Sequence, residues 1–158
     1  MLTGTPVLNP TRPEDVVGTV TETATKQVGV AVRIAAETQP AWAARSVAER
    51  ADMLRRAADL YEENAVEFFA LATREAGKSL GDAVAEVREA VDFLRYYAAE
   101  ADKVETGTSA RGVIACISPW NFPLAIFTGQ IARGTAFVLR KESGPGSSRP
   151  ARSWVRPR

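Results

Sequence analysis

The chain has 158 residues, enough for one domain with a core, and its 46% hydrophobic and 25% charged residues are ordinary for a globular protein. It contains no histidine and one cysteine, Cys116, which excludes an internal disulfide framework, serine–histidine and cysteine–histidine catalysis within the chain, and most zinc sites. No apolar run reaches the roughly 18–20 residues of a membrane span, and no secretory signal is visible. We therefore expect a cytoplasmic location and no membrane partner.

The formal charge of +1 hides two segments of opposite character. From Arg133 to Arg158 there are seven Lys and Arg residues against one acid, Glu142, which leaves 13 basic and 18 acidic residues in positions 1–132. Nine of the last seventeen residues are Gly, Pro or Ser, a composition typical of disorder. We therefore divide the chain into a body, 1–132, and a basic low-complexity tail, 133–158, which we hypothesise to be translated from a shifted reading frame.

The N-terminal half predicts a short strand followed by helices. Residues 16–20 contain three valines and favour an edge strand or hairpin arm. A first helix is expected from Thr25, as its cap, to about Glu37, because Pro40 should end it. Ser46 and Glu49 fit a capping box at the start of a second helix, whose inward stripe consists of Val47, Ala51, Leu54, Ala58 and Tyr61.

Two further helices are expected before residue 103. The third, at about 65–76, should turn Val66, Phe69 and Ala72 inward and end at Gly77, where a left-handed cap is needed. The longest helix should run from about 80 to 102, with an apolar stripe formed by Val84, Val87, Val91, Leu94 and Ala98.

The last part of the body changes its pattern. Val113–Ile117 is a continuous apolar run between turn formers, which is typical of a strand buried on both faces of a parallel sheet, with Cys116 as a small buried residue. Two prolines stiffen a loop at 119–123, and residues 124–132 have helical character. Strand, loop and helix begin a βαβ unit, so the predicted fold class is α/β with an incomplete sheet.

Asn121 is an amide in the middle of this apolar segment. A side chain that follows a parallel strand lies at the sheet edge where α/β folds bind ligands. Asn121 would present two N–H donors from a stiff backbone, which suits the stabilisation of a developing oxyanion. An asparagine that satisfies its own loop backbone would fit the same pattern, and the residues alone leave both interpretations open.

The loop Ser118–Pro123, SPWNFP, resembles the PWNFP element of the aldehyde dehydrogenase superfamily. Other elements of that superfamily are matched in order: Asn9-Pro10 with Val17–Val20, Pro40–Trp42, and Glu75–Lys78 followed by Glu86. Within the superfamily, residues 86–101 and 117–132 are most similar to the Δ1-pyrroline-5-carboxylate dehydrogenase module, which in bacteria is often the second half of bifunctional proline utilization A enzymes.

This resemblance implies the N-terminal part of an aldehyde dehydrogenase fold, a helical segment plus the first strand, loop and helix of a Rossmann-like sheet. It further implies oxidation of L-glutamate γ-semialdehyde to L-glutamate with NAD, or NADP, as hydride acceptor. Asn121 would donate to the oxyanion that forms when a cysteine thiolate attacks the aldehyde. The resemblance also implies that part of the cofactor wall is formed by Ile117, Ser118, Pro119 and Trp120. Phe122 would line the substrate entrance, and Lys141 is a weak match for a lysine that contacts the adenosine ribose.

The chain also departs from the family pattern. Cys116 precedes the loop and does not match the nucleophile, which in the family lies far downstream with the base glutamate and the oligomerisation elements. We therefore expect an inactive N-terminal fragment of a homo-oligomeric parent, because chemistry that acts as a unit collapses without its nucleophile. A third interpretation is a regulatory fragment that docks onto the complete enzyme.

The alternative from a different class is a non-enzymatic helical binding protein. Its basic tail would hold an anionic partner through salt-sensitive contacts. Nucleic acid is not the partner we expect, because Trp154 is the only aromatic residue among the last seventeen residues of the tail for stacking on bases.

Overall fold

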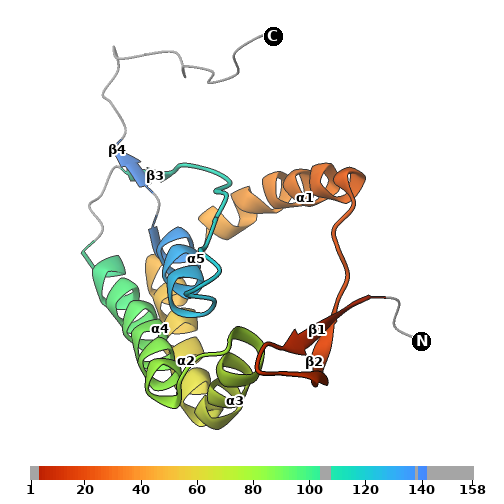
Figure 1. The fold of residues 1–158 in the computed structure, drawn as a ribbon. Coiled ribbons are helices and arrows are strands. Elements are labelled where there is room, and N and C mark those ends of the chain that lie inside the picture. The colour runs from red at the N-terminus through yellow and green to blue at the C-terminus, as the bar shows by residue number, and fades with distance from the viewer. Residues whose placement is uncertain (1–3, 104–107, 138, 142–158) are drawn as a thin grey trace.

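The computed structural model describes residues 4–103, 108–137 and 139–141, which form a hairpin, a separate helix and a helical body (Figure 1). In chain order the elements are β1 (Thr5–Asn9), β2 (Arg12–Val20), α1 (Thr25–Ala43), α2 (Val47–Glu63), α3 (Ala65–Ala76), α4 (Leu80–Ala101), β3 (Thr108–Ala110), α5 (Ala125–Phe137) and β4 (Leu139–Lys141). Strands β1 and β2 pair antiparallel, as do β3 and β4. No helix in these ranges is both long enough and apolar enough to cross a membrane.

The hydrophobic core lies where α4 packs between α2 and α5. Alanines with no exposed surface line the contacts, and they let the helix axes approach closely. The predicted stripes of the second and fourth helices are confirmed, with Val84 half-buried at one end. The buried members of the core are Ala51, Leu54, Ala58, Val87, Val91, Leu94, Ala98, Ala101, Ala132 and Ala136.

Both predicted helix signals in the middle of the chain are confirmed. The Ser46 hydroxyl accepts a hydrogen bond from the Glu49 amide at 3.1 Å, and the Glu49 carboxylate accepts one from the Ser46 amide at 2.8 Å. Gly77 ends α3 in the left-handed region, with φ of 65°. A Cβ at Gly77 would lie 2.9 Å from Cγ of Pro10, so the glycine also allows the hairpin to approach α3.

The predicted hairpin arm at 16–20 is confirmed as part of β2, and a bidentate ion pair attaches this hairpin to α3. Arg74 Nε donates to Asp15 Oδ2 at 3.1 Å, and Arg74 Nη2 donates to Oδ1 at 2.5 Å. Asn9 Nδ2 donates to the same carboxylate at 3.0 Å. The hydrogen bonds from Arg74 and then Asn9 lower the pKa of Asp15 to about 2.

The variant Arg74→Gln should raise the pKa of Asp15 from about 2 toward its ordinary value of 3.8. Because the folded state depresses this pKa, the stabilisation is complete above about pH 4 and is lost as the pH falls through about 2. An NMR titration of the Asp15 carboxyl carbon measures the shift. Arg12→Gln is the matched control, since Arg12 contributes the weakest effect on Asp15; equal titration curves for the two variants would contradict the assignment.

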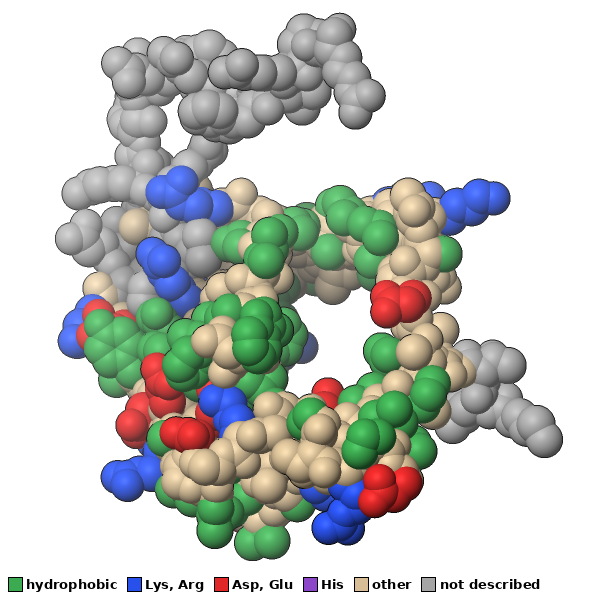
Figure 2. Space-filling view, in the orientation of Figure 1, with side chains coloured by type: hydrophobic (Ala, Val, Ile, Leu, Met, Phe, Trp, Pro, Cys, Tyr) green, Lys and Arg blue, Asp and Glu red, His purple; other side chains and the backbone are tan. Residues whose placement is uncertain are grey.

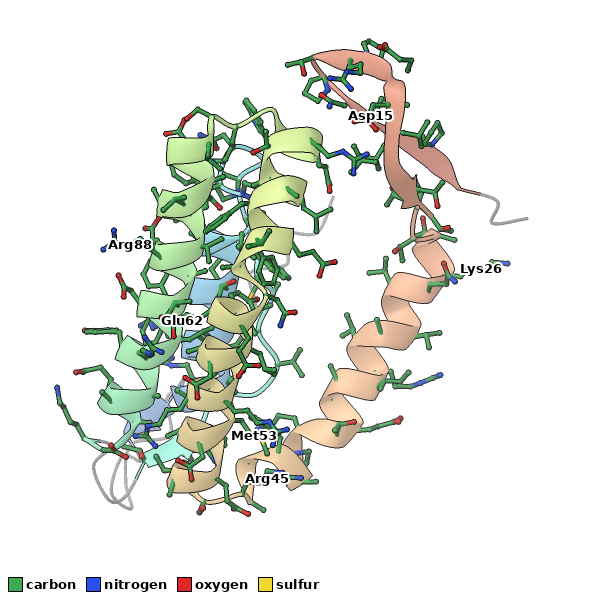
Figure 3. All side chains as sticks on the ribbon, turned by 90° about the horizontal axis from the view of Figure 1, so that it is seen from below. Asp15, Lys26, Arg45, Met53, Glu62 and Arg88 are labelled. Atoms are coloured by element: carbon green, nitrogen blue, oxygen red, sulfur yellow. The ribbon has the colours of Figure 1, made fainter. Side chains whose placement is uncertain are left out.

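Helix α1 differs from the prediction at both ends. Ala24, rather than Thr25, is the N-cap, and the helix continues through Pro40 to Ala43. Pro40 has no N–H to donate to the Ala36 carbonyl, so one hydrogen bond of the helix is missing. Because α1 has no buried residue, the missing bond leaves no polar group buried inside the protein. Figures 1 and 2 show α1 standing apart from the helical body, and Lys26 points away from it in Figure 3.

Two predictions of buried apolar residues are wrong. Val66, expected to point inward from α3, is 79% exposed, and Phe68 packs against the core in addition to the predicted Phe69. Val113–Ile117 forms no strand, and Ile117 is 84% exposed. A central strand needs neighbours on both sides for its backbone groups, and the strands of the described ranges form only the two antiparallel pairs. Cys116 is accordingly half-buried rather than buried.

The boundary drawn at residue 132 falls inside a helix. Residues 124–132 were expected to be helical, and α5 confirms this but runs on to Phe137. The predicted disorder of residues 142–158 lies outside the described residues.

Candidate functional site

The PWNFP loop is a turn that leads directly into α5. The Phe122 amide donates to the Pro119 carbonyl at 3.4 Å, and α5 begins two residues after Pro123. The side chain of Asn121 is exposed and bonds to no other residue of the described ranges. The structure therefore disfavours an asparagine that satisfies its own loop, and it leaves both N–H donors free to bind something else.

The residues expected beside Asn121 form an open surface. Ile117 is 84% exposed, Trp120 is 88% exposed and Pro119 is also exposed, whereas Ser118 is half-buried. The carbonyl of Ile117 accepts a hydrogen bond from Gln130 Nε2 at 2.8 Å, which ties this segment to α5. The apolar side chains of Ile117 and Trp120 thus face solvent, while α5 holds the backbone of the segment through the Gln130 hydrogen bond.

Lys141 is not brought near this loop. It lies in β4, where its backbone pairs with Thr108, and β4 follows α5 while the loop precedes it. A helix of 13 residues is about 20 Å long, so the two ends of α5 separate Lys141 from Asn121. The sequence-predicted residues therefore form one contiguous group at the loop and one outlier.

Two residues that hold the loop received no role from the sequence: Glu86 and Lys78. Glu86 Oε2 accepts hydrogen bonds from the amides of Leu124 and Ala125, each at 3.1 Å, and Lys78 Nζ lies 3.2 Å from Oε1. The Lys78 ammonium also lies 4.7 Å from the centre of the Phe122 ring. Two signals were available: Glu86 is an acid within the apolar stripe of the fourth helix, and Glu86 and Lys78 both belong to the upstream motifs that carry the family resemblance.

The described part of the site offers a donor but no acid–base or nucleophilic group. Cys116 is half-buried and lines an apolar groove of about 400 Å³, together with Trp42 and Ile131; Asn121 is not among the groove's lining residues. Within the described ranges no three His, Cys, Asp or Glu residues are grouped as metal ligands would be. By itself this arrangement can bind an anionic oxygen or a carbonyl, and it can present an apolar wall.

Comparison with known proteins assigns the class. Residues 2–141 match the model of the aldehyde dehydrogenase family, which is well over half of the chain. The chain belongs to the aldehyde dehydrogenase family, as the loop and its upstream motifs indicated.

Particular relatives place it more closely. The chain is 49% identical over 133 residues to the bifunctional protein PutA of Escherichia coli strain K12, covering 83% of this chain and 10% of that protein. It is 32% identical over 154 residues to the 1-pyrroline-5-carboxylate dehydrogenase of Bacillus cytotoxicus, covering 86% of this chain and 30% of that protein. These matches confirm the predicted similarity to this branch of the family.

Solved structures confirm the fold. An aldehyde dehydrogenase from Brucella melitensis biovar abortus 2308 has a TM-score of 0.78 at 34% identity, covering 85% of this chain and 30% of that one. A bifunctional proline utilization A (PutA) protein gives 0.71 at 39% identity, covering 76% and 14%. The chain is thus a mixed helix and strand structure that resembles part of this fold, and it spans 30% or less of these relatives.

Proposed function

We propose that this chain supplies the oxyanion donor and part of the cofactor wall of an NAD(P)-dependent dehydrogenase that oxidises L-glutamate γ-semialdehyde to L-glutamate. The observation that carries the proposal is the exposed, unpaired amide of Asn121 on a loop held by α4 and α5. The names of the relatives, PutA and 1-pyrroline-5-carboxylate dehydrogenase, support the substrate and a role in proline catabolism.

Asn121 would act by donating its side-chain N–H to the oxygen of the aldehyde as that oxygen becomes negative. A donor stabilises such a charge best when it needs no reorganisation at the moment of reaction. Within the described residues the Asn121 side chain makes no hydrogen bond, so its amide can bind this oxygen without breaking one. Phe122, whose ring faces Lys78 on one side and is 40% exposed, would line the substrate entrance.

The segment Ile117–Trp120 fits the wall of a nicotinamide cofactor site. Ile117 and Trp120 leave most of their apolar surface uncovered beside Asn121, and a flat heterocycle would remove this surface from water. When bound, the cofactor would accept the hydride from the substrate. NAD is our expectation and NADP the alternative; Lys141, at the other end of α5, is proposed to contact the adenosine ribose.

The remainder of the dehydrogenase would complete what this chain begins. Val113–Ile117 would become a strand of the Rossmann-like sheet once neighbouring strands pair with its backbone. The nucleophilic cysteine and the base glutamate would also come from that remainder. We propose that the complete enzyme is a cytoplasmic homo-oligomer.

The proposal is tested by comparing the isolated chain with a chimera. In the chimera, residues 5–132 replace the matching segment of the Bacillus cytotoxicus 1-pyrroline-5-carboxylate dehydrogenase. The isolated chain should show no reduction of NAD or NADP with L-glutamate γ-semialdehyde, because it lacks the nucleophile. The chimera should reduce cofactor in a substrate-dependent way, measured by absorbance at the wavelength of the reduced nicotinamide.

Either of two outcomes would contradict the proposal. Turnover by the isolated chain would show that the chemistry does not depend on the missing nucleophile. A chimera that folds and forms the oligomer of the parent but has no activity would show that this segment cannot supply the site.

A further inference from the structure

Glu86 is the largest fully buried side chain of the described residues, with 2% of its surface exposed. It stands on the apolar face of α4, where Ala83 and Ala90 one turn away on either side have no exposed surface. A carboxylate in such a place is retained only if it is paired and hydrogen-bonded, because its desolvation is otherwise strongly unfavourable. The contacts of Glu86 should therefore explain its presence.

The two oxygens of Glu86 have different partners. Oε2 accepts from the Leu124 and Ala125 amides, which lie at the start of α5 and have no acceptor within that helix. Oε1 lies 3.2 Å from the Lys78 ammonium, whose side chain is only 14% exposed. The carboxylate thus caps α5 from another helix, and its negative charge is favourable at a helix N-terminus. Lys78 neutralises the charge.

Both residues contact positions that follow Asn121 closely in the sequence. Glu86 fixes Leu124, three residues after Asn121, and Lys78 lies over the ring of Phe122, the residue directly after it. On the other side, Gln130 holds the carbonyl of Ile117. The side chain of Asn121 makes no hydrogen bond within the described residues, so its position depends on the backbone that these neighbours hold.

We propose that the Glu86–Lys78 pair is a positioning device that sets the location of the Asn121 amide by anchoring the start of α5 and the Phe122 ring. Only the catalytic consequence of this inference, an effect on kcat, rests on the proposed function. The structural part, that the buried pair holds the loop, stands on the contacts of this chain alone.

The first test measures amide hydrogen exchange by NMR in the full 158-residue chain. Glu86→Gln keeps the shape of the side chain but removes the charge that both amides and Lys78 share. Hydrogen bonds to a charged group are the stronger ones, so exchange at Leu124 and Ala125 should become about 10- to 100-fold faster. Glu89→Gln, the same change one turn along α4, should leave both rates unaltered. Unaltered rates in Glu86→Gln would overturn the proposal.

A second pair of variants keeps the test decisive if Glu86→Gln does not fold. Lys78 is not a member of the hydrophobic core, so Lys78→Met spares the packing of α4. A buried carboxylate that has lost its cation is left without compensation for its desolvation, so it holds the start of α5 less firmly and the same two amides should exchange several-fold faster. Lys78→Arg should restore the rates, because it keeps the positive charge. Equal rates in the Met and Arg variants would overturn the proposal.

The catalytic consequence is read in the chimera. Loss of a transition-state donor lowers kcat and kcat/KM equally, so Glu86→Gln should lower kcat by about tenfold or more with KM for the aldehyde unchanged. A rise in KM with kcat unchanged would instead assign Glu86 a role in binding alone and overturn the positioning role. If the unmodified chimera were inactive, the proposed function would fail while the exchange result stood; if it were active and the exchange rates did not respond, only the positioning proposal would fail.

Discussion

Asn121→Ala in the chimeric dehydrogenase is expected to lower kcat by about 10²–10³, with little change in KM for the aldehyde. The reason is that the amide would contact the reacting oxygen strongly only after it becomes negative, so its removal weakens binding of the transition state and not of the substrate. Steady-state rates of cofactor reduction at saturating and limiting aldehyde separate the two parameters.

A matched asparagine provides the control for this variant. Asn64 also carries an exposed amide, and its Nδ2 donates to the Leu60 carbonyl at the end of α2 at 2.8 Å. Asn64→Ala should therefore cost some stability and leave kcat unchanged. An equal loss of kcat in both variants would mean that Asn121 acts only through folding, and an unchanged kcat in Asn121→Ala would remove it from the chemistry.

The features of this fold that could be predicted are those that depend on neighbours within a few residues. The Ser46–Glu49 box and the left-handed Gly77 satisfy groups of their own helix ends, and both are found where the sequence placed them. The stripes of α2 and α4 follow from helical periodicity in the same way. Local chemistry was sufficient for these elements.

The features that could not be predicted depend on partners distant in the sequence. The apolar run Val113–Ile117 has the composition of a buried strand, but a strand exists only when neighbours pair with its backbone, and no such neighbours occur among the described residues. Val66 fitted the helical period of α3, yet the packing of α3 against α4 leaves it exposed.

In the candidate site, too, the local features could be predicted from the sequence and the long-range contacts could not. The loop and Asn121 were visible in the sequence because two prolines and an apolar segment isolate the amide. The link from Glu86 to Leu124 joins residues 38 positions apart, and only the packing of α5 on α4 brings it about. An acid inside an apolar helical stripe indicates that a partner exists, but the pattern cannot say which residue it is.

Leu94→Ala is expected to lower the free energy of unfolding by about 2–5 kcal/mol. Leu94 is 5% exposed on α4, the helix that packs against both α2 and α5. Six of the ten buried core residues are alanines, so Leu94 is one of few large side chains that fill the centre. Helix α1 adds no buried residue, and no hairpin residue belongs to the core cluster. A loss of this size is therefore a large share of the total for a domain stable by about 5–15 kcal/mol.

Urea unfolding followed by circular dichroism measures the effect as a lower midpoint at an unchanged slope. Leu80→Ala is the matched control, because Leu80 lies on the same helix but is 65% exposed, and it should change the free energy by no more than about 0.5 kcal/mol. Equal midpoints for the two variants would mean that the α2–α4–α5 core does not determine the stability of the chain. A selective effect of Leu94→Ala would show that this core folds without the remaining strands of the family's sheet, since only α4 and its helical neighbours bury that side chain.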